Sequence, residues 1–394
     1  MNTILFDDSR WESLLPLTFT KPVSYLRTGI LTFKERWEKS LKHKVSCLSK
    51  DYLAEKFPVC TEDVNLLINS GVFPESGLMK EIKKLRINEV LISDNVVLAA
   101  VLEKRDILKL SRSNLDGLTI KNTSPVLQIR NTWDLFKING DAIKFDYKLL
   151  TRARKSEKIS KTNRLVNAKN IFIEKGAKVE FAVINAEAGP VYIGKEAEIM
   201  EGSLIRGPFA LCEHAVVKMG AKIYGPTTIG PHSKVGGEIN NSVISAYSNK
   251  AHDGFLGNSV LGEWCNLGAD TNNSNLKNNY AEVKLWSYES ERFEKTGLQF
   301  CGLIMGDHSK CGINTMFNTG TVVGICSNLF GDGFMRNFIP SFSWGGASGF
   351  TVFTLPKVFE VASIVMARRE INLDEADKKI IAQVFDATKK YRQF

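Results

Sequence analysis

The chain has 394 residues, 43% of them hydrophobic, and a net charge of +9 at pH 7. This length favours two domains with large cores, and no apolar run is long enough to predict a membrane span. The first residues lack the basic and apolar pattern of a signal peptide, so we expect a cytoplasmic protein with no membrane partner. The seven cysteines include no CxxC pair, which argues against structural zinc. No nucleic-acid-binding motif accompanies the positive charge, and we expect no nucleic acid partner.

Strand-like and helical segments alternate over residues 1–150. Apolar runs indicate strands at residues 1–6 and 64–68, residues 90–102 and 118–120 add strand-like or mixed pieces, and helical spacing covers residues 30–41, 76–85 and 131–138. This alternation is typical of an α/β domain with a mostly parallel sheet covered by helices. The first strand ends in Asp7 and Asp8, which would then lie at the sheet edge where α/β folds bind ligands.

Residues 151–165 are strongly basic and join this domain to the rest of the chain. Arg152, Arg154 and Lys155 are followed by further lysines up to Arg164. The segment reads as a solvated linker, and the alternative is that its charge attracts phosphorylated ligands.

An aliphatic residue recurs at every sixth position through the next region, residues 166–345. The unbroken series is Ile193, Ile199, Ile205, Leu211, Val217, Ile223, Ile229 and Val235. The period fits neither a helix nor an ordinary strand and predicts a parallel β-helix with six residues per side. The ladder returns as Phe255, Leu261 and Leu267, and again as Met305, Cys311, Phe317 and Val323. An irregular β-sandwich is the alternative architecture.

Two segments interrupt or follow the repeat. Residues 272–300 break the hexads, and we expect a loop extruded from the coil that contributes to function. Residues 346–394 have helical spacing and alternating charge. This tail would cap the open end of the coil or form a trimer contact, since exposed coil ends are prone to association.

Two motifs resemble one family. Phe6-Asp7-Asp8 followed by Leu15-Pro-Leu-Thr-Phe-Thr-Lys21-Pro22 resembles the opening of sugar-1-phosphate nucleotidyltransferases, and Lys250-Ala-His252-Asp-Gly-Phe255-Leu-Gly257 resembles an acetyltransferase centre. Together, in this order, they resemble the bifunctional GlmU-like family, most closely its divergent alternate bacterial group. The resemblance implies a nucleotidyltransferase-like α/β domain followed by a hexapeptide-repeat left-handed parallel β-helix and a C-terminal helix.

The resemblance also implies roles for residues of the repeat region. His252 would be the general base that takes the proton of the attacking amine, a role that suits imidazole, although a surface histidine in a turn is the plain alternative. Asn266 and Asn275 would contact the amino sugar, Ala269 would lie near the acetyl group of the cofactor, and Phe255 replaces a family tyrosine.

A phosphate-gripping arginine and lysine of the family are missing, since their places read Leu211–Glu213 and Asn240. Their substitutes remain open, with the candidates Lys218, Lys222, Lys234 and Lys250.

The N-terminal motif also departs from its family. No glycine-rich loop follows the first strand, so Asp7, Asp8, Arg10 and Lys21 are the candidate nucleotide-binding residues. Asn69 stands where an aspartate would hold Mg²⁺. The resemblance implies that nucleotidyl transfer needs Mg²⁺. The protein ligands of this ion are left open, with Asp7, Asp8 or Asp146 as candidates.

The interpretation is a trimeric transferase of sugar-nucleotide biosynthesis. It would move an acetyl group from acetyl-CoA to an amino-sugar phosphate such as glucosamine-1-phosphate. It would also couple a nucleoside triphosphate to a sugar-1-phosphate, as in UDP-N-acetylglucosamine synthesis. The alternatives are an acyltransferase with a degenerate N-terminal domain and a non-catalytic scaffold that binds sugar nucleotides. The sequence does not name the sugar, the base or the acyl group.

Overall fold

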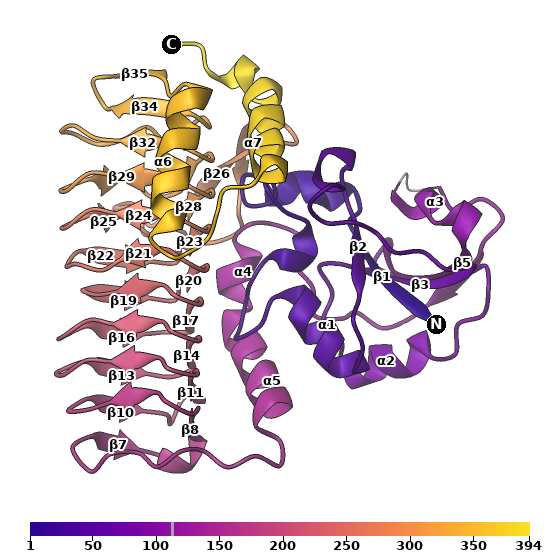
Figure 1. Cartoon of the computed structure of the whole chain (residues 1–394), viewed down its shortest axis with the longest axis horizontal. Coiled ribbons are helices and arrows are strands. Elements are labelled where there is room, and N and C mark those ends of the chain that lie inside the picture. The colour runs from indigo at the N-terminus through magenta and orange to yellow at the C-terminus, as the bar shows by residue number, and fades with distance from the viewer. Residues whose placement is uncertain (112–113) are drawn as a thin grey trace. The chain divides into compact units, whose positions relative to one another are not determined.

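The computed structural model describes residues 1–111 and 114–394, and these form two compact units (Figure 1). The first unit comprises residues 1–26 and 31–131, and the second comprises residues 27–30 and 132–394. The division falls at residue 131, whereas the sequence prediction placed the boundary at 150. The cause is that residues 132–150 pack on the repeat region rather than on the N-terminal sheet.

The N-terminal unit is built on a six-stranded mixed sheet. In spatial order its strands are β2 (Ser46–Leu48), β1 (Asn2–Phe6), β3 (Val64–Asn69), β5 (Val96–Glu103), β4 (Glu89–Ser93) and β6 (Thr119–Asn122). β1 pairs in parallel with β2 and β3, and β4 with β6, whereas β5 runs antiparallel to both of its neighbours. The predicted mostly parallel sheet is therefore wrong at β5. Residues 90–102 are not one strand but two, joined by a tight turn in which Asp94 and Asn95 have positive φ.

Both faces of this sheet are covered, which explains the continuous apolar run of β1. Leu5 belongs to one core with Trp37 and Ile68, and the adjacent residues Ile4 and Phe6 belong to the opposite core. The helices of the unit are α1 (Phe33–Leu41), α2 (Ser76–Ile82) and α3 (Leu108–Ser111), with the short 3₁₀ helices η1 (Ser9–Leu14), η2 (Val23–Tyr25), η3 (Asp51–Leu53) and η4 (Lys104–Asp106).

Helix α1 begins where its sequence provides a capping box. The Thr32 hydroxyl accepts from the Glu35 amide at 3.1 Å, and the Glu35 carboxylate accepts from the Thr32 amide at 2.7 Å. The helix then buries Trp37, whose indole donates to the Val72 carbonyl at 2.9 Å.

The predicted helix at residues 131–138 is short, and the helix after it was missed. The structure has α4 (Asp134–Lys137) and α5 (Asn139–Thr151), and the latter contacts the solenoid strands β14 and β17. Asn139 fixes this contact, since its side chain accepts from the Thr228 hydroxyl at 2.9 Å and donates to the Pro226 carbonyl at 3.0 Å. Residues 154–160 are then irregular, and Arg154 bonds the Glu174 carboxylate with two guanidinium nitrogens.

The repeat region is a parallel β-solenoid with three faces. The first face holds β7 (Arg164–Val166), β10 (Val183–Asn185), β13 (Leu204–Arg206), β16 (Lys222–Tyr224), β19 (Glu238–Asn240) and β22 (Phe255–Gly257), with β25 (Asn272–Asn273) and β30 (Met316–Phe317) as a further pair. The second face holds β8 (Ile171–Ile173), β11 (Val191–Ile193), β14 (Phe209–Leu211), β17 (Thr227–Ile229), β20 (Val243–Ile244), β23 (Val260–Leu261), β28 (Leu303–Met305), β31 (Thr321–Val323) and β33 (Phe338–Ile339).

The third face carries the candidate site. It holds β9 (Lys178–Val179), β12 (Glu198–Ile199), β15 (Val216–Val217), β18 (Lys234–Val235), β21 (Asn249–Lys250), β24 (Asn266–Leu267), β29 (Lys310–Cys311), β32 (Asn328–Leu329), β34 (Ser343–Gly346) and β35 (Gly349–Val352). Along each two-residue strand from β12 to β32, the second residue points inward and the first points outward.

The predicted ladder is confirmed, with one correction. All eight residues from Ile193 to Val235 lie in the solenoid core and expose 3% or less of their surface. The inward residue of β22 is Leu256 and not Phe255, because Leu261 follows Leu256 after five residues rather than six. The inward position between Ile244 and Leu256 is taken by a lysine, Lys250, which exposes 1% of its surface.

The interruption and the tail pack on the last coils. Within residues 272–300, β26 (Lys284–Ser287) and β27 (Arg292–Lys295) form an antiparallel hairpin, and Trp286 stacks on Phe338 at 4.2 Å between ring centroids. The tail is not purely helical, since β34 pairs with β35 before the helices begin. Helices α6 (Leu355–Ala367) and α7 (Glu375–Ala387) and the 3₁₀ turn η6 (Lys389–Tyr391) follow. Within the described chain, no helix has the length and apolarity needed to cross a membrane.

Candidate functional site

The corner between the third and first faces presents His252. Residues 251–254 connect β21 to β22, and the His252 side chain is exposed at the outer edge of this corner. In the coil below, the same corner is only two residues long, Gly236-Gly237. A Cβ on Gly237, which has a φ of +72°, would lie 2.9 Å from the His252 carbonyl oxygen. The glycine pair therefore gives the His252 corner room to lie close against the coil.

Lys250 holds the same corner from inside the solenoid. Its Nζ donates to the carbonyl oxygens of His252 and Asp253, at 2.5 and 3.0 Å. Burial lowers the pKa of this ammonium to about 8, against the partial opposition of Asp253 and Asp270. Lys250 was one of the candidate phosphate ligands predicted from the sequence. Its ammonium is instead buried in the solenoid and does not reach a phosphate outside it.

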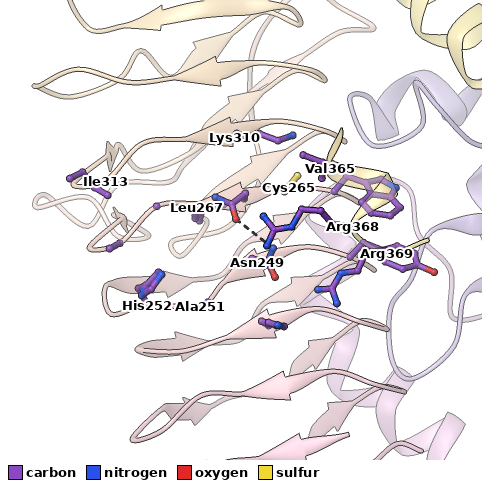
Figure 2. A pocket seen from close by; sticks show the side chains of 16 residues that line it. Asn249, Ala251, His252, Cys265, Leu267, Lys310, Ile313, Val365, Arg368 and Arg369 are labelled. Atoms are coloured by element: carbon purple, nitrogen blue, oxygen red, sulfur yellow. Dashed lines mark hydrogen bonds between the residues drawn. The ribbon is translucent and has the colours of Figure 1, made fainter. Parts of the chain in front are cut away.

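A cavity of about 780 Å³ lies on the third face of the solenoid, where the end of α6 approaches the strands (Figure 2). It gathers His252, Asn266 and Ala269, three of the residues predicted for acyl transfer. In Figure 2, His252 lies at one end of the cavity, and Arg368 and Arg369 reach in from the opposite side. Its volume falls in the range of about 300–1,000 Å³ that is usual for small-molecule sites.

The cavity is cationic. Its lining, within the described part of the chain, includes Lys234, Lys310, Arg368 and Arg369 and no carboxylate. Burial is the first cause that lowers the pKa of Lys234, and the nearby Arg369 is the second. Burial also lowers the pKa of Lys310. An anionic ligand would stabilise the charged form of these two buried lysines.

One wall of the cavity is part of a column of stacked rings. Neighbouring rings, from His214 through His232, Tyr247 and Trp264 to His308, lie 4.2 to 6.1 Å apart between centroids with planes within 17°. All five residues have positive φ and occupy the same corner, between the second and third faces, in successive coils. Tyr247 and Trp264 line the cavity. Arg369 is anchored beside the column by its bond to the His232 carbonyl, at 3.1 Å.

Two residues predicted for this site lie elsewhere. Asn275 donates to the Asn258 side chain at 2.8 Å, at the corner between the first and second faces, and does not line the cavity. Phe255 begins β22 on the first face, where its amide donates to the Asn272 side chain at 2.8 Å. Of the four lysines considered as substitutes for the missing phosphate ligands, Lys234 is the one in the cavity lining.

Several residues of the cavity were not predicted, among them Asn249, Arg368 and Arg369. Asn249 lies beside Asn266, with 3.5 Å between its Nδ2 and the Asn266 Oδ1, and its own Oδ1 is buried without a partner among the described residues. Both asparagines directly precede an inward residue, so the position before each rung of the ladder was an available signal. Arg368 and Arg369 carried no such signal, because their proximity depends on where the tail folds back.

The N-terminal candidates meet at the carboxyl edge of β1 and β3. Arg10 binds the Asp8 carboxylate through Nε at 2.8 Å and through its NH2 nitrogen at 2.7 Å, and a third nitrogen donates to Gln128 at 2.7 Å. Asn69 also donates to Asp8, at 2.9 Å. The predicted position of Asp7 and Asp8 at this edge is confirmed by the register of β1 with β3.

Asp7 is turned inward. Its Oδ2 accepts from the Ser49 hydroxyl at 2.5 Å and from the Val23 amide at 3.2 Å. Burial raises the pKa of this carboxyl to about 6, although these hydrogen bonds oppose the shift. Lys21 is buried as well, with 6% of its surface exposed, and does not line the small depression at this edge.

These side chains do not fit a Mg²⁺ ion held by the protein. Asp8 is already bonded by Arg10 and Asn69, and Asp7 faces the interior. Asp146 belongs to the second unit, where its carboxylate accepts from the Ile30 amide at 2.9 Å. Over the described ranges, no cluster of three or more histidine, cysteine or acidic side chains is suited to a metal.

The fold and the two sites define a chain that joins a mixed α/β domain to a hexapeptide-repeat β-solenoid. Residues 3–155 match the model of the sugar nucleotidyl transferase family. The chain is also similar, at low identity, to bifunctional GlmU-like proteins.

Three relatives illustrate the similarity. The bifunctional protein GlmU of Methanocaldococcus jannaschii is 36% identical over 87 residues, 22% of this chain and 21% of that protein. The bifunctional sugar-1-phosphate nucleotidylyltransferase/acetyltransferase of Sulfurisphaera tokodaii is 25% identical over 268 residues, 67% of this chain and 57% of that protein. The uncharacterized acetyltransferase YaiX of Escherichia coli O6:K15:H31 is 28% identical over 143 residues, 36% of this chain and 61% of that protein. The chain spans less than two thirds of the length of each.

Proposed function

We propose that the solenoid transfers an acetyl group from acetyl-CoA to the amine of an amino-sugar phosphate. The observation that carries this proposal is the cavity that joins His252 and Asn266 to four cations without a carboxylate in its described lining. Acetyl-CoA is a polyanion with a planar base, so the cations suit its phosphates and the Tyr247–Trp264 wall suits a ring. The similarity to a bifunctional sugar-1-phosphate nucleotidylyltransferase/acetyltransferase supports acetyl transfer as the reaction class.

The reaction needs a base beside the thioester. The amine nitrogen forms a bond to the acetyl carbon, the carbon–sulfur bond breaks, and the proton of the amine passes to the His252 imidazole. The imidazole then returns the proton to the departing CoA thiolate. Asn249 and Asn266, on adjacent strands, would orient the acceptor through their amides, since the Asn249 Oδ1 has a free lone pair for a hydroxyl or amine donor.

The test is His252→Ala, assayed with acetyl-CoA and a panel of amino-sugar phosphates. Loss of the base should lower kcat by roughly 10²- to 10⁴-fold. The control is His43→Ala, which removes an exposed histidine of the N-terminal unit and should leave the rate unchanged. Wild-type turnover in His252→Ala would remove this assignment.

We also propose, as a second activity, nucleotidyl transfer to a sugar-1-phosphate in the N-terminal unit, which would complete a UDP-N-acetylglucosamine-type product. The family match of residues 3–155 and the carboxylates at the strand edge support it. The ion pair between Asp8 and Arg10 instead favours a degenerate domain, because it occupies both side chains in the absence of a ligand. Pyrophosphate release from a panel of nucleoside triphosphates and sugar-1-phosphates, with and without Mg²⁺, separates these two readings.

We further propose that the protein is a homotrimer. The first face of the solenoid exposes apolar side chains in register, with Val183 and Leu204 exposing 42% and 49% of their surface. Packing between copies would cover them. Light scattering should give about three times the chain mass of 44.0 kDa. A stable monomer at micromolar concentration would contradict this.

A further inference from the structure

The inward position of Lys250 is the most unusual feature of the solenoid core. Its neighbour in the coil below, in register with it, is Val235, and the next inward residue along the chain is Leu256. Every other rung from Ile193 to Leu267 is aliphatic. Placing an ammonium among such residues is unfavourable unless its donors are used, and an apolar residue of similar length would fill the space without that cost.

The donors of Lys250 are directed at one target, the corner that carries His252. Two of them bind the carbonyls of His252 and Asp253. The Asp253 carbonyl also accepts from the Asp270 amide at 3.1 Å, whereas in the described chain the His252 carbonyl has Lys250 as its donor. Lys250 therefore provides the hydrogen bond that joins the His252 carbonyl to the solenoid core.

The coil below is adapted to the same corner from outside. Gly236 and Gly237 form the shortened corner, and a Cβ on Gly236 would lie 2.4 Å from the Ala251 carbonyl oxygen. The His252 corner is thus held between an inner hydrogen-bond donor and an outer surface without side chains. Two independent features of the fold constrain the backbone that carries one exposed imidazole.

We propose that Lys250 is a positioning residue for acyl transfer, which fixes the His252 backbone by binding its carbonyl from inside the coil. The inference rests on the proposed role of His252 as the base. Lys250 does not touch the substrate, because it exposes 1% of its surface. Its loss would leave the cavity and its cations in place and would let the imidazole move away from the attacking amine.

The test is Lys250→Met, which keeps an unbranched chain and removes the donors. The expected result is a fall in kcat of about 10- to 100-fold with the KM for acetyl-CoA within about twofold. Hydrogen–deuterium exchange should be faster at residues 251–255 and unchanged elsewhere in the solenoid. The control is Leu261→Met, a volume-conserving change at another core rung, which should alter neither quantity.

A double variant identifies the route of the effect. In a His252→Ala background, Lys250→Met should cause no further loss of kcat, because a residue that acts through the imidazole has nothing left to position. Unchanged kcat and unchanged exchange in Lys250→Met would overturn the proposal, as would an equal loss in both backgrounds.

The exchange measurement separates this inference from the proposed function. If the wild-type protein shows no acyl transfer, the function fails, and faster exchange at the corner still shows that Lys250 holds it. If Lys250→Met does not fold, Gly237→Ala replaces it. Its added Cβ presses on the His252 carbonyl from outside, and it should give the same kcat loss and the same local exchange.

Discussion

The two candidate sites differ in how their charges are balanced. In the solenoid cavity, four cations line a volume of about 780 Å³ without a carboxylate among the described lining residues. At the N-terminal edge, Arg10 is bonded to Asp8 and Gln128, and the remaining depression is almost filled. An unbalanced site is completed by a ligand, whereas a balanced one must first break its own ion pair. The solenoid is therefore the better supported centre.

The difference extends to the supporting backbone. The solenoid presents Asn249 and Asn266 from parallel strands in register, and His252 from a corner held on two sides. The N-terminal edge presents Arg10 from a short 3₁₀ helix, η1, whose first residues follow directly on Asp8. Side chains on a repeated, rigid frame keep their spacing without a ligand, and those on a short turn need one.

The largest expected effect would test the cationic wall. The double substitution Arg368→Ala and Arg369→Ala should raise the KM for acetyl-CoA by about 100-fold, since each charged hydrogen bond contributes about 1.5–3 kcal/mol. The KM for acetyl-pantetheine, which lacks the nucleotide phosphates, should not change. Lys357→Ala, on the exposed side of α6, is the control. Equal losses with both donors would show that the arginines act on the fold rather than on phosphate.

A second prediction could reverse the comparison. If the N-terminal unit is active, Arg10→Ala and Lys21→Ala should each reduce pyrophosphate release at least tenfold, because each removes a cation that the family resemblance makes a candidate triphosphate contact. Acyl transfer should be unaffected in both variants. Absence of turnover in the wild-type protein, over the whole panel of triphosphates and sugar-1-phosphates, would instead support a degenerate domain.

The third prediction concerns Asp7 and is a change of folding stability with pH rather than a change of activity. Its folded-state pKa of about 6 lies above the ordinary value of 3.8, so the folded state binds the extra proton and loses stability as pH rises from about 4 to 6. Asp7→Asn should match the wild type at pH 4 and be more stable at pH 7.5 by at most about 3 kcal/mol, the free energy that corresponds to a pKa raised from 3.8 to about 6. Calorimetry at both pH values tests this.

The control for Asp7→Asn is Asp116→Asn, in an exposed turn, which should show no such pH dependence. If Asp7→Asn is instead destabilising at pH 7.5, the buried carboxylate contributes more through Ser49 and Val23 than burial costs it.

The repeat itself could be predicted from sequence because each rung is an independent signal. Eight aliphatic residues at one spacing identify the coil, and the spacing alone puts His252 at a corner and Asn266 on a strand. The ladder went out of phase after Val235, where the two-residue Gly236-Gly237 corner shortens the period. Phe255 was assigned in place of Leu256 because Leu261 follows Leu256 after five residues rather than six, and the inward position of Lys250 was hidden by the same error.

Features that depend on distant segments could not be predicted. Helix α5 has a weak pattern of its own and is defined by Asn139, which bonds Pro226 and Thr228 far along the chain. Arg368 and Arg369 enter the cavity through the path of the tail, which no local pattern encodes. Asn275 matched a family residue, but it lies at the corner between the first and second faces and not at the cavity.

The column of stacked rings has a consequence for how the solenoid assembles. The aliphatic core is nearly the same in every coil, so it does not distinguish correct pairing of neighbours from pairing one coil out of place. From His232 to His308 each ring differs from its neighbours, and stacked aromatic pairs contribute about 0.5–1.5 kcal/mol each. A coil that skipped its neighbour would leave Trp264 without Tyr247 and His232 without His214. The column therefore favours the correct pairing of neighbouring coils, because a coil paired out of place loses its ring stacking.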